Sequence, residues 1–195
     1  MRTAEITRKT NETDITLKLN LDGTGKYIND TGCGFLNHML DLFSKHGRFD
    51  MEVICRGDVN VDDHHTVEDV GIALGEAFTK ALGDKKGIAR YGSMILPMDE
   101  SLILCSLDIS ARSLLVFDVK IPAKKVGTFD TELTKEFMAA LTRSMGLTLH
   151  IKMLEGENSH HIIEAIFKGL GRALQKAVAI EEAYKDEIPS TKGML

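Results

Sequence analysis

His64-His65-Thr66-Val67-Glu68 and His160-His161-Ile162-Ile163-Glu164 are two copies of one pattern, His-His-x-x-Glu. Each copy opens an apolar segment whose hydrophobic residues recur at helical spacing, so we expect each at the start of a helix. These two frames hold four of the seven histidines in the chain. A pattern repeated this closely predicts that the chain contains two halves with the same fold.

The spacing within each copy predicts where its side chains point. On a helix, the first histidine and the glutamate four residues later share a face, while the second histidine points about 100° away. Adjacent histidines that diverge cannot easily hold one ion together, but they can serve two ions, one on each side. The partial positive charge at a helix N-terminus keeps the rings neutral, as a metal requires. The expected N-cap residues are Asp62 and Asp63 before the first copy, and Asn158 and Ser159 before the second.

Hydrophobic periodicity divides the chain into two βββαβα halves. In the first half, strands are expected at 3–9, 13–21, about 26–29 and 49–55, with helices at 35–45 and 64–82. The second half repeats this order, with strands at about 92–98, 101–109, 113–121 and 147–154 and helices at 131–145 and 160–179. The predicted fold class is α+β with an internal duplication. Residues 1–86 and 87–181 form the two halves of a single unit, and 182–195 form a C-terminal tail.

An alignment of the two halves adds one candidate ligand to each. Pairing Gly47 with Gly146 places Met51 opposite His150, and it places Glu136 opposite His38 to within one residue. The helix before each doublet therefore contributes a further metal-binding group. Eight candidate ligands result: His38, His64, His65, Glu68, Glu136, His160, His161 and Glu164. Eight groups divide naturally into two ions with four protein ligands each.

The chemistry of these ligands narrows the kind of site. One doublet alone would equally suit a solvated surface pair, but two identical frames favour metal binding. Four mixed nitrogen and oxygen ligands leave open positions on an octahedral ion, which a substrate can fill. The absence of thiolate ligands argues against structural zinc and favours Mn²⁺, although imidazoles also suit Zn²⁺, Fe²⁺ and Ni²⁺.

Composition excludes several classes of partner. A formal net charge of −5 provides no basic face for nucleic acid. Three cysteines without a CxxC motif predict reduced thiols. The N-terminus lacks the apolar core of a signal peptide, and no apolar run approaches membrane-spanning length. We therefore expect a soluble, cytoplasmic protein with no membrane partner.

Two features suggest a phosphate-binding group, each with a simpler alternative. Lys168 follows Glu164 by one helical turn, which places a cation beside the ligands or forms an ordinary i,i+4 ion pair. The tail Pro189-Ser190-Thr191-Lys192-Gly193 combines hydroxyl groups with a lysine, as in a phosphate cradle, or is a frayed terminus. The glycines in Lys168-Gly169-Leu170-Gly171 lie inside a helix and indicate close helix packing rather than nucleotide binding.

Together with the doublets and the tail, Phe35-Leu36-Asn37-His38-Met39-Leu40 and Lys45-His46-Gly47 closely resemble the imidazoleglycerol-phosphate dehydratase family. The resemblance covers essentially the whole chain and points to the monofunctional form. It implies a hydro-lyase of histidine biosynthesis that converts imidazoleglycerol phosphate to imidazole-acetol phosphate and water. It also implies two four-stranded sheets around a four-helix layer, similar to ribosomal protein S5 domain 2, with two Mn²⁺ ions per active site. A cytoplasmic homo-oligomer of twenty-four copies is implied as well.

The same resemblance assigns roles to individual residues. It implies metal ligands at the eight positions above, with Glu136 standing where familiar members have histidine. Among these, His65, His161 and Glu164 are also implied in catalysis, and Glu12 and Glu164 are the candidates for the carboxylate base. The substrate and its phosphate group are implied to contact Glu12, His46, Arg90, Arg112, Lys168, Ser190 and Lys192. Leu42 stands where some members have a substrate-binding glutamine, so that contact is expected to be missing.

Two other functions use the same residue types. A binuclear phosphohydrolase would attack the phosphate ester with metal-bound hydroxide and release free phosphate. A metal-storage or metal-sensing protein needs no phosphate-binding group, so its metal affinity would be indifferent to phosphate esters. The identity of the product and the response to phosphate esters separate these alternatives from a dehydratase.

Overall fold

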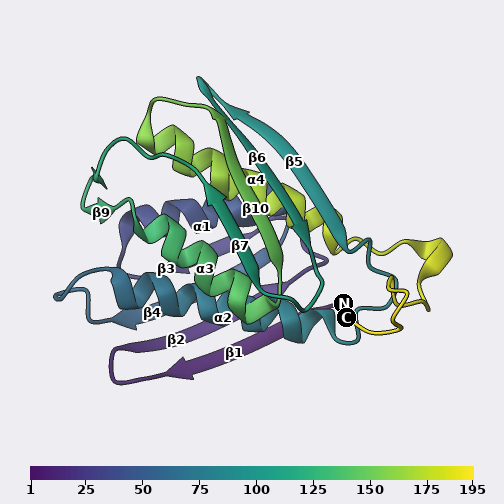
Figure 1. Ribbon diagram of the computed structural model, residues 1–195. Helices are drawn as coiled ribbons and strands as arrows, with labels where there is room; N and C mark the ends of the chain where they lie inside the picture. Colours follow the sequence, from purple (N-terminus) through teal and green to yellow (C-terminus); the bar gives the residue numbers. More distant parts are fainter.

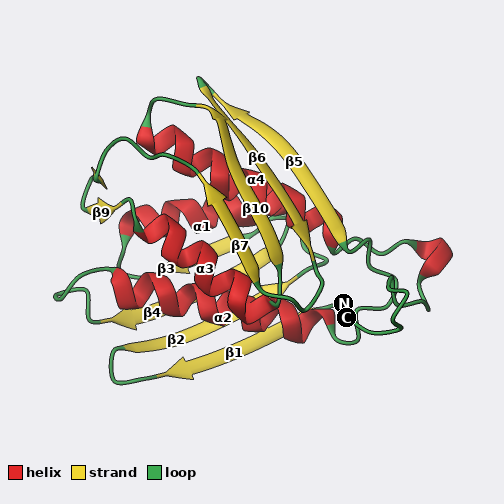
Figure 2. Ribbon diagram, viewed as in Figure 1, coloured by secondary structure: helices red, strands yellow, loops and turns green.

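The computed structural model describes all 195 residues and places a layer of four helices between two four-stranded sheets (Figure 1). Figure 2 shows the same arrangement by element type, with the helices enclosed by strands on both sides. The predicted α+β class, with its two sheets and its helix layer, is therefore confirmed. None of the helices combines the length and apolar character needed to cross a membrane.

The first sheet comes from residues whose side chains alternate between the core and solvent. Along β2 the inward-facing Ile15, Leu17 and Leu19 are buried, while the outward-facing Lys18 forms an ion pair with Glu52. The strand order is β1-β2-β4-β3, and β3 and β4 are the parallel pair. The strands are β1 (Thr3–Lys9), β2 (Thr13–Asn20), β3 (Tyr27–Asp30) and β4 (Asp50–Gly57).

The second sheet repeats this topology in the order β5-β6-β10-β7, with β7 parallel to β10. Its strands are β5 (Tyr91–Met98), β6 (Ser101–Asp108), β7 (Leu114–Asp118) and β10 (Thr148–Glu155). Two short elements were not predicted from the sequence. One is a hairpin of β8 (Lys125–Val126) and β9 (Phe129–Asp130), and the other is the 3₁₀ helix η1 (Glu182–Tyr184).

The helices exchange partners between the halves. The four are α1 (Gly34–Gly47), α2 (His64–Leu82), α3 (Leu133–Met145) and α4 (Ser159–Ala177). The first-half helix α1 packs against α4 of the second half, and α3 packs against α2. All four helices begin at the same end of the molecule, at the left of Figure 1. This arrangement brings the start of both His-His-x-x-Glu helices to one end.

Backbone contact between helices depends on glycine at equivalent positions. A Cβ atom at Gly171 of α4 would lie 2.7 Å from the carbonyl oxygen of Phe43 in α1. At Gly75 of α2, it would lie 2.9 Å from the carbonyl oxygen of Leu141 in α3. The glycines of the Lys168–Gly171 segment therefore allow close packing, as the sequence indicated.

The ends of α1 and α3 fix the register of the internal repeat. Arg48 and Gly146 both adopt the left-handed conformation there, and their N–H groups donate to Ser44 and Thr142. The eight-residue strands β4 and β10 each begin two residues later. This register places Met51 opposite Leu149, so the alignment with His150 was wrong by one residue. The error arose because Arg48, and not Gly47, occupies the left-handed position that glycine usually fills.

Candidate functional site

The start of α4 is held by the side chain of Asn158. Its Oδ1 accepts hydrogen bonds from the backbone N–H groups of His160 (2.9 Å) and His161 (3.3 Å), which confirms the predicted cap. Ser159 has another role, because its Oγ accepts from the N–H of Ala123. At the start of α2, only one of the two predicted cap residues is confirmed. Asp62 Oδ1 accepts from the His64 N–H at 2.8 Å, whereas Asp63 makes no side-chain cap.

Three of the eight candidate ligands meet where α1 crosses α4. The potential ligand atoms of His38, His160 and Glu164 all lie within 4.8 Å of one another. His160 Nε2 is 3.4 Å from Glu164 Oε2, as expected for residues one helical turn apart. His38 comes from the first half and the other two from the second, so the exchange of helices creates this group. His38 is exposed and Glu164 is buried, so one side of the group faces solvent while the other is fixed in the core.

The charge around Glu164 suits a divalent cation. Burial raises the pKa of its carboxyl, but the hydrogen bond from Lys168 and the nearby positive charges outweigh burial and lower it. Lys168 Nζ lies 2.5 Å from Glu164 Oε1, so the simple i,i+4 ion pair is present. Two imidazoles and an ionised carboxylate form a mixed donor set that fits Mn²⁺ or a similar ion.

The second histidine of the α4 doublet turns away from this group. The rings of His160 and His161 are 6.2 Å apart with an interplanar angle of 77°, which confirms that the pair diverges. His161 Nδ1 donates to Glu100 Oε2 at 2.7 Å, and this hydrogen bond raises the pKa of His161. Glu100 lies in the turn between β5 and β6, together with Asp99, whose Oδ2 is 3.7 Å from His161 Nε2.

The first doublet has the same geometry. The rings of His64 and His65 are 6.2 Å apart at 85°. His65 Nδ1 donates to Asp58 Oδ2 at 3.0 Å, which raises the pKa of His65. His65 Nε2 faces Glu12 in the β1–β2 turn, with its Oε1 3.6 Å away. Each doublet thus presents one ring whose Nδ1 is occupied by a carboxylate.

The remaining candidate ligands do not gather within one chain. No other set of three potential ligands has its atoms within 4.8 Å of one another. Glu68 points to α3, where Arg143 is 3.0 Å from its Oε1. Glu136 occupies the position in α3 that His38 occupies in α1, and it lines a hollow of about 320 Å³ beside Phe117 and Ile121.

The predicted phosphate-binding arginines gather around one carboxylate. Arg90 donates to both oxygens of Asp108, at 2.7 and 3.1 Å, and Arg112 lies 3.6 Å from the same carboxylate. Arg90 also donates to the carbonyl oxygen of Pro189 at 2.7 Å, which holds the tail that carries Ser190 and Lys192. Arg90 stacks over the ring of Tyr91 with its Cζ 4.8 Å from the ring centre.

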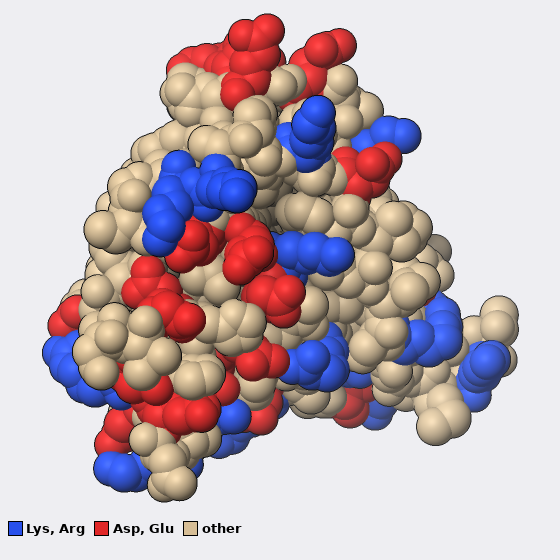
Figure 3. All heavy atoms as spheres, turned by 60° about the vertical axis from the view of Figure 1, so that its left-hand side comes forward, with Lys and Arg blue, Asp and Glu red and all other residues tan.

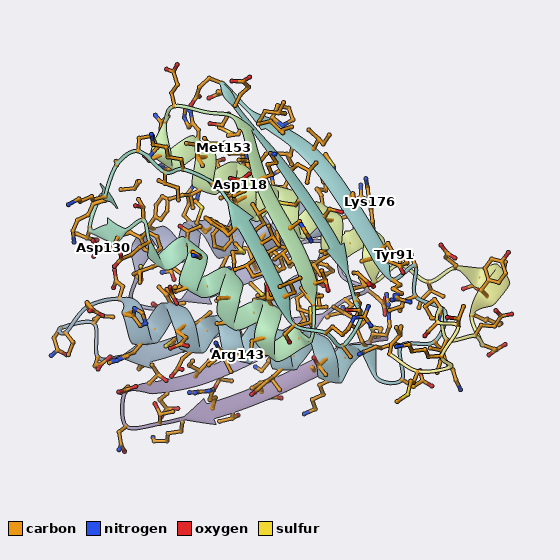
Figure 4. All side chains as sticks on the ribbon, in the orientation of Figure 1. Tyr91, Asp118, Asp130, Arg143, Met153 and Lys176 are labelled. Atoms are coloured by element: carbon orange, nitrogen blue, oxygen red, sulfur yellow. The ribbon has the colours of Figure 1, made fainter.

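Arg90 and Arg112 (the arginine group) lie at one end of α4, and His38, His160 and Glu164 (the ligand group) lie at the other. The backbone N–H of Arg90 donates to Ala177, thirteen residues beyond Glu164, which corresponds to about 20 Å along the helix axis. Figure 4 shows Tyr91 beside the C-terminal segment, far from Asp130 at the end where the helices begin. Figure 3 turns that second end forward and shows acidic side chains crowded beside basic ones.

His46 and Lys168 lie between these two groups. Burial and the charges of Lys168 and Arg172 lower the pKa of His46, so its ring is held neutral beside two cations. Three contacting residues were missed in the sequence: Asp58, Glu100 and Asp108. Comparison of the β5–β6 turn with the β1–β2 turn, which carries Glu12, would have pointed to Glu100. No pattern in the sequence indicated that Asp108 would pair with Arg90.

Comparison with known proteins places this chain in a family. The family model for imidazoleglycerol-phosphate dehydratase matches residues 31–174. Dehydratases of this name from Jannaschia sp. (strain CCS1) and Dinoroseobacter shibae are 57% and 58% identical, over the full length of both chains. The crystal structure of the enzyme from Staphylococcus aureus superposes with a TM-score of 0.84 at 40% identity, covering 92% of this chain and 99% of that chain.

A second solved structure agrees. The enzyme from Pyrococcus furiosus, in complex with (S)-C348, has a TM-score of 0.84 and 41% identity, covering 97% of this chain and all of that one. The match of fold and sequence extends across both halves, which include the doublets and the ligand group. The chain therefore belongs to the imidazoleglycerol-phosphate dehydratase family, hydro-lyases of histidine biosynthesis.

Proposed function

We propose that this protein catalyses the Mn²⁺-dependent dehydration of D-erythro-imidazoleglycerol phosphate to imidazole-acetol phosphate and water. The observation that carries the proposal is the group of His38, His160 and Glu164 with Lys168 beside it, in a chain of this family. The whole chain acts as one catalytic unit of two repeated halves, and residues 182–195 serve as its phosphate-binding tail.

Two divalent ions per active site would be held by the eight candidate ligands named from the sequence. Bound there, they would supply Lewis acidity that favours negative charge on the imidazole ring of the substrate. The donor atoms are imidazole nitrogens and carboxylate oxygens only, which favours Mn²⁺ over a structural zinc site. Glu136 adds a carboxylate where His38 provides an imidazole in the other half, so one ion would have a harder ligand set.

Two distances in the structure support our proposal that an active site combines groups from more than one copy of the chain. His65 and His161 diverge from the first histidines, and nothing in the same chain completes a four-ligand set around either ring. The arginine group lies about 20 Å from the ligand group along α4, a distance too long for one small phosphate ester to span. We therefore infer a homo-oligomer, of twenty-four copies as the family resemblance implies, with ligands and phosphate-binding groups contributed by neighbours.

The two candidate bases differ in how free their carboxylates are. Glu164 is buried and hydrogen-bonded by Lys168, which suits a ligand. Glu12 is exposed in the β1–β2 turn, and its carboxylate accepts no hydrogen bond within the chain. Glu12 would take the proton from the carbon next to the one that loses hydroxide, and the resulting enol would rearrange to the ketone.

The phosphate group would be bound by charge and by directed donors. Arg90 and Arg112 provide guanidinium groups, and Ser190 and Lys192 add a hydroxyl and an ammonium from the tail. Asp108 holds Arg90 in place through two hydrogen bonds. His46 and Lys168 lie closer to the ligand group, where Lys168 would add positive charge beside the bound substrate.

The deciding experiment offers imidazoleglycerol phosphate to chelator-stripped protein with and without added Mn²⁺, following product mass and free phosphate together. Metal-dependent loss of one water with phosphate retained supports the proposal. Phosphate release would identify a phosphohydrolase, and metal binding without turnover would favour storage or sensing. Light scattering before and after Mn²⁺ is restored tests the assembly, and a monomer in both states would refute it.

Variants of the ligand group connect the activity to the structure. His160→Ala removes a ligand from the group and should lower bound Mn²⁺ and abolish turnover. Glu157→Gln serves as the control, because this nearby exposed carboxylate takes part in no hydrogen bond or ion pair and its loss should leave both unchanged. Full activity of His160→Ala at saturating substrate would show that the group is not the metal site.

A further inference from the structure

Glu100 is held more firmly than a residue in an exposed hairpin turn requires. Its Oε1 accepts from the N–H of Asn158 at 2.8 Å and from the hydroxyl of Ser101 at 3.1 Å. Its Oε2 accepts from His161 Nδ1 at 2.7 Å. A carboxylate oxygen can only accept, and both oxygens of Glu100 are engaged by donors, two of them from the start of α4.

This acceptor determines which nitrogen carries the proton in the neutral ring of His161. A carboxylate can only accept, so Nδ1 keeps its hydrogen and, in the neutral ring, Nε2 presents its lone pair. That is the form in which an imidazole ligates a metal through Nε2. Carboxylates placed in this way around metal ligands orient the ring and raise its basicity.

In the first half, Asp58 and not a residue of the β1–β2 turn accepts from Nδ1 of the second histidine. Asp58, which directly follows β4, accepts from His65 Nδ1 and leaves His65 Nε2 free. The β1–β2 turn corresponds to the β5–β6 turn that carries Glu100, yet its Glu12 faces Nε2 and not Nδ1. In each half one carboxylate accepts from Nδ1, and a second carboxylate in the turn faces Nε2: Glu12 lies 3.6 Å from His65 and Asp99 lies 3.7 Å from His161.

We propose that Glu100 and Asp58 are positioning residues that hold His161 and His65 in the Nδ1–H tautomer, with Nε2 directed outward to a metal ion. The inference rests on the proposed function, because it takes both second histidines to be ligands. Glu100 also connects the β5–β6 turn to the start of α4, so the test must separate tautomer control from this structural connection.

Glu100→Gln makes that separation. The glutamine keeps the size of the side chain, and its single oxygen is needed by the backbone N–H groups of Asn158 and Glu157. Its NH₂ group therefore faces His161 Nδ1, which must accept, and the proton moves to Nε2. The connection between turn and helix survives, while the ligating nitrogen is blocked.

The readout is Mn²⁺ affinity of the stripped, fully assembled protein, measured from free Mn²⁺ by electron paramagnetic resonance. Glu100→Gln should bind one ion per chain about 10- to 100-fold more weakly, as for other lost partners of metal ligands. Its unfolding midpoint without metal should match wild type. Glu157→Gln removes the same charge nearby and should change neither quantity. Asp58→Ala leaves His65 Nδ1 without its acceptor and should weaken Mn²⁺ binding in the first half as well.

A double-mutant cycle tests whether the effect passes through the ring. In a His161→Ala background, Glu100→Gln should cause no further loss of Mn²⁺ affinity, because the ring that it positions is gone. An equal loss in both backgrounds, or wild-type affinity in the single variant, would overturn the inference. Failure of the proposed function looks different, since wild-type protein would then bind no Mn²⁺ or form no dehydrated product.

Discussion

Replacement of Gly171 by alanine tests the close contact between α1 and α4 that brings His38 to His160. The new Cβ would lie 2.7 Å from the Phe43 carbonyl oxygen and 3.1 Å from the Gly47 nitrogen, against the 3.4 Å at which ordinary contact begins. Both neighbours are backbone atoms of a helix, so the two helices must separate by several tenths of an ångström. Overpacking of this kind costs about 1–3 kcal/mol.

Alanine also favours helix formation, which offsets part of that cost. In a helix interior it is about 0.8–1 kcal/mol better than glycine. Because the contacts are with backbone atoms that cannot turn aside, we take the upper part of the overpacking range, about 2–3 kcal/mol, so the net loss should be about 1–2 kcal/mol. For a chain of this length, each kcal/mol shifts the melting temperature by about 2–4 °C, so we expect a decrease of about 2–8 °C. Circular dichroism of the stripped protein at fixed concentration measures it, and bound Mn²⁺ should fall as well.

Gly34→Ala provides the matched control. Gly34 begins α1, and a Cβ there would meet no atom within 4 Å. Only the helix-propensity gain remains, so stability should rise by at most about 1 kcal/mol. The two substitutions are the same and their predicted effects are opposite in sign. A Gly171→Ala protein as stable as wild type would show that the helices do not approach as closely as the structure has them.

Three further predictions concern other parts of the chain. Burial raises the pKa of all three thiols, to about 11 for Cys33 and Cys55 and to about 12 for Cys105. At pH 8 a thiol reagent should therefore modify none of them before unfolding and all of them afterwards, as counted by mass spectrometry. Asp69→Ala should lower the free energy of unfolding by about 1–3 kcal/mol in urea, because Thr13 and Arg8 lose their buried acceptor. Lys192→Ala should mainly raise KM, and an unchanged KM would remove the tail from the substrate site.

Local patterns were enough to predict most of the fold. Alternation in the strands and apolar spacing after each doublet placed all eight strands of the two main sheets and all four helices. Their ends moved by a few residues at most. The divergence of His160 from His161 also followed from helix geometry alone. These features depend on neighbours in sequence, so a single chain contains the information for them.

Features that depend on distant contacts were not predictable in this way. Nothing near Glu100 in sequence shows that its carboxylate reaches His161, sixty-one residues away. The short β8–β9 hairpin has too few residues for a periodic pattern. The register error at Met51 came from assuming that glycine must end a helix, whereas Arg48 adopts that conformation. Each miss reflects a tertiary contact or a conformation that composition does not specify.

The exchange of helices between the halves explains why the ligand group belongs to the whole chain. If α1 packed within its own half, His38 would lie beside the first doublet and Glu136 beside the second. Because α1 instead crosses α4, the imidazole of His38 joins His160 and Glu164, and the carboxylate of Glu136 is carried on α3 beside α2. The two proposed ligand sets would therefore be chemically unequal although the halves fold alike. The same exchange packs the ring of His160 against Phe35 and His38 of α1, while His161 faces the Glu100 turn, so the two rings of this doublet point to different neighbours from one helix start.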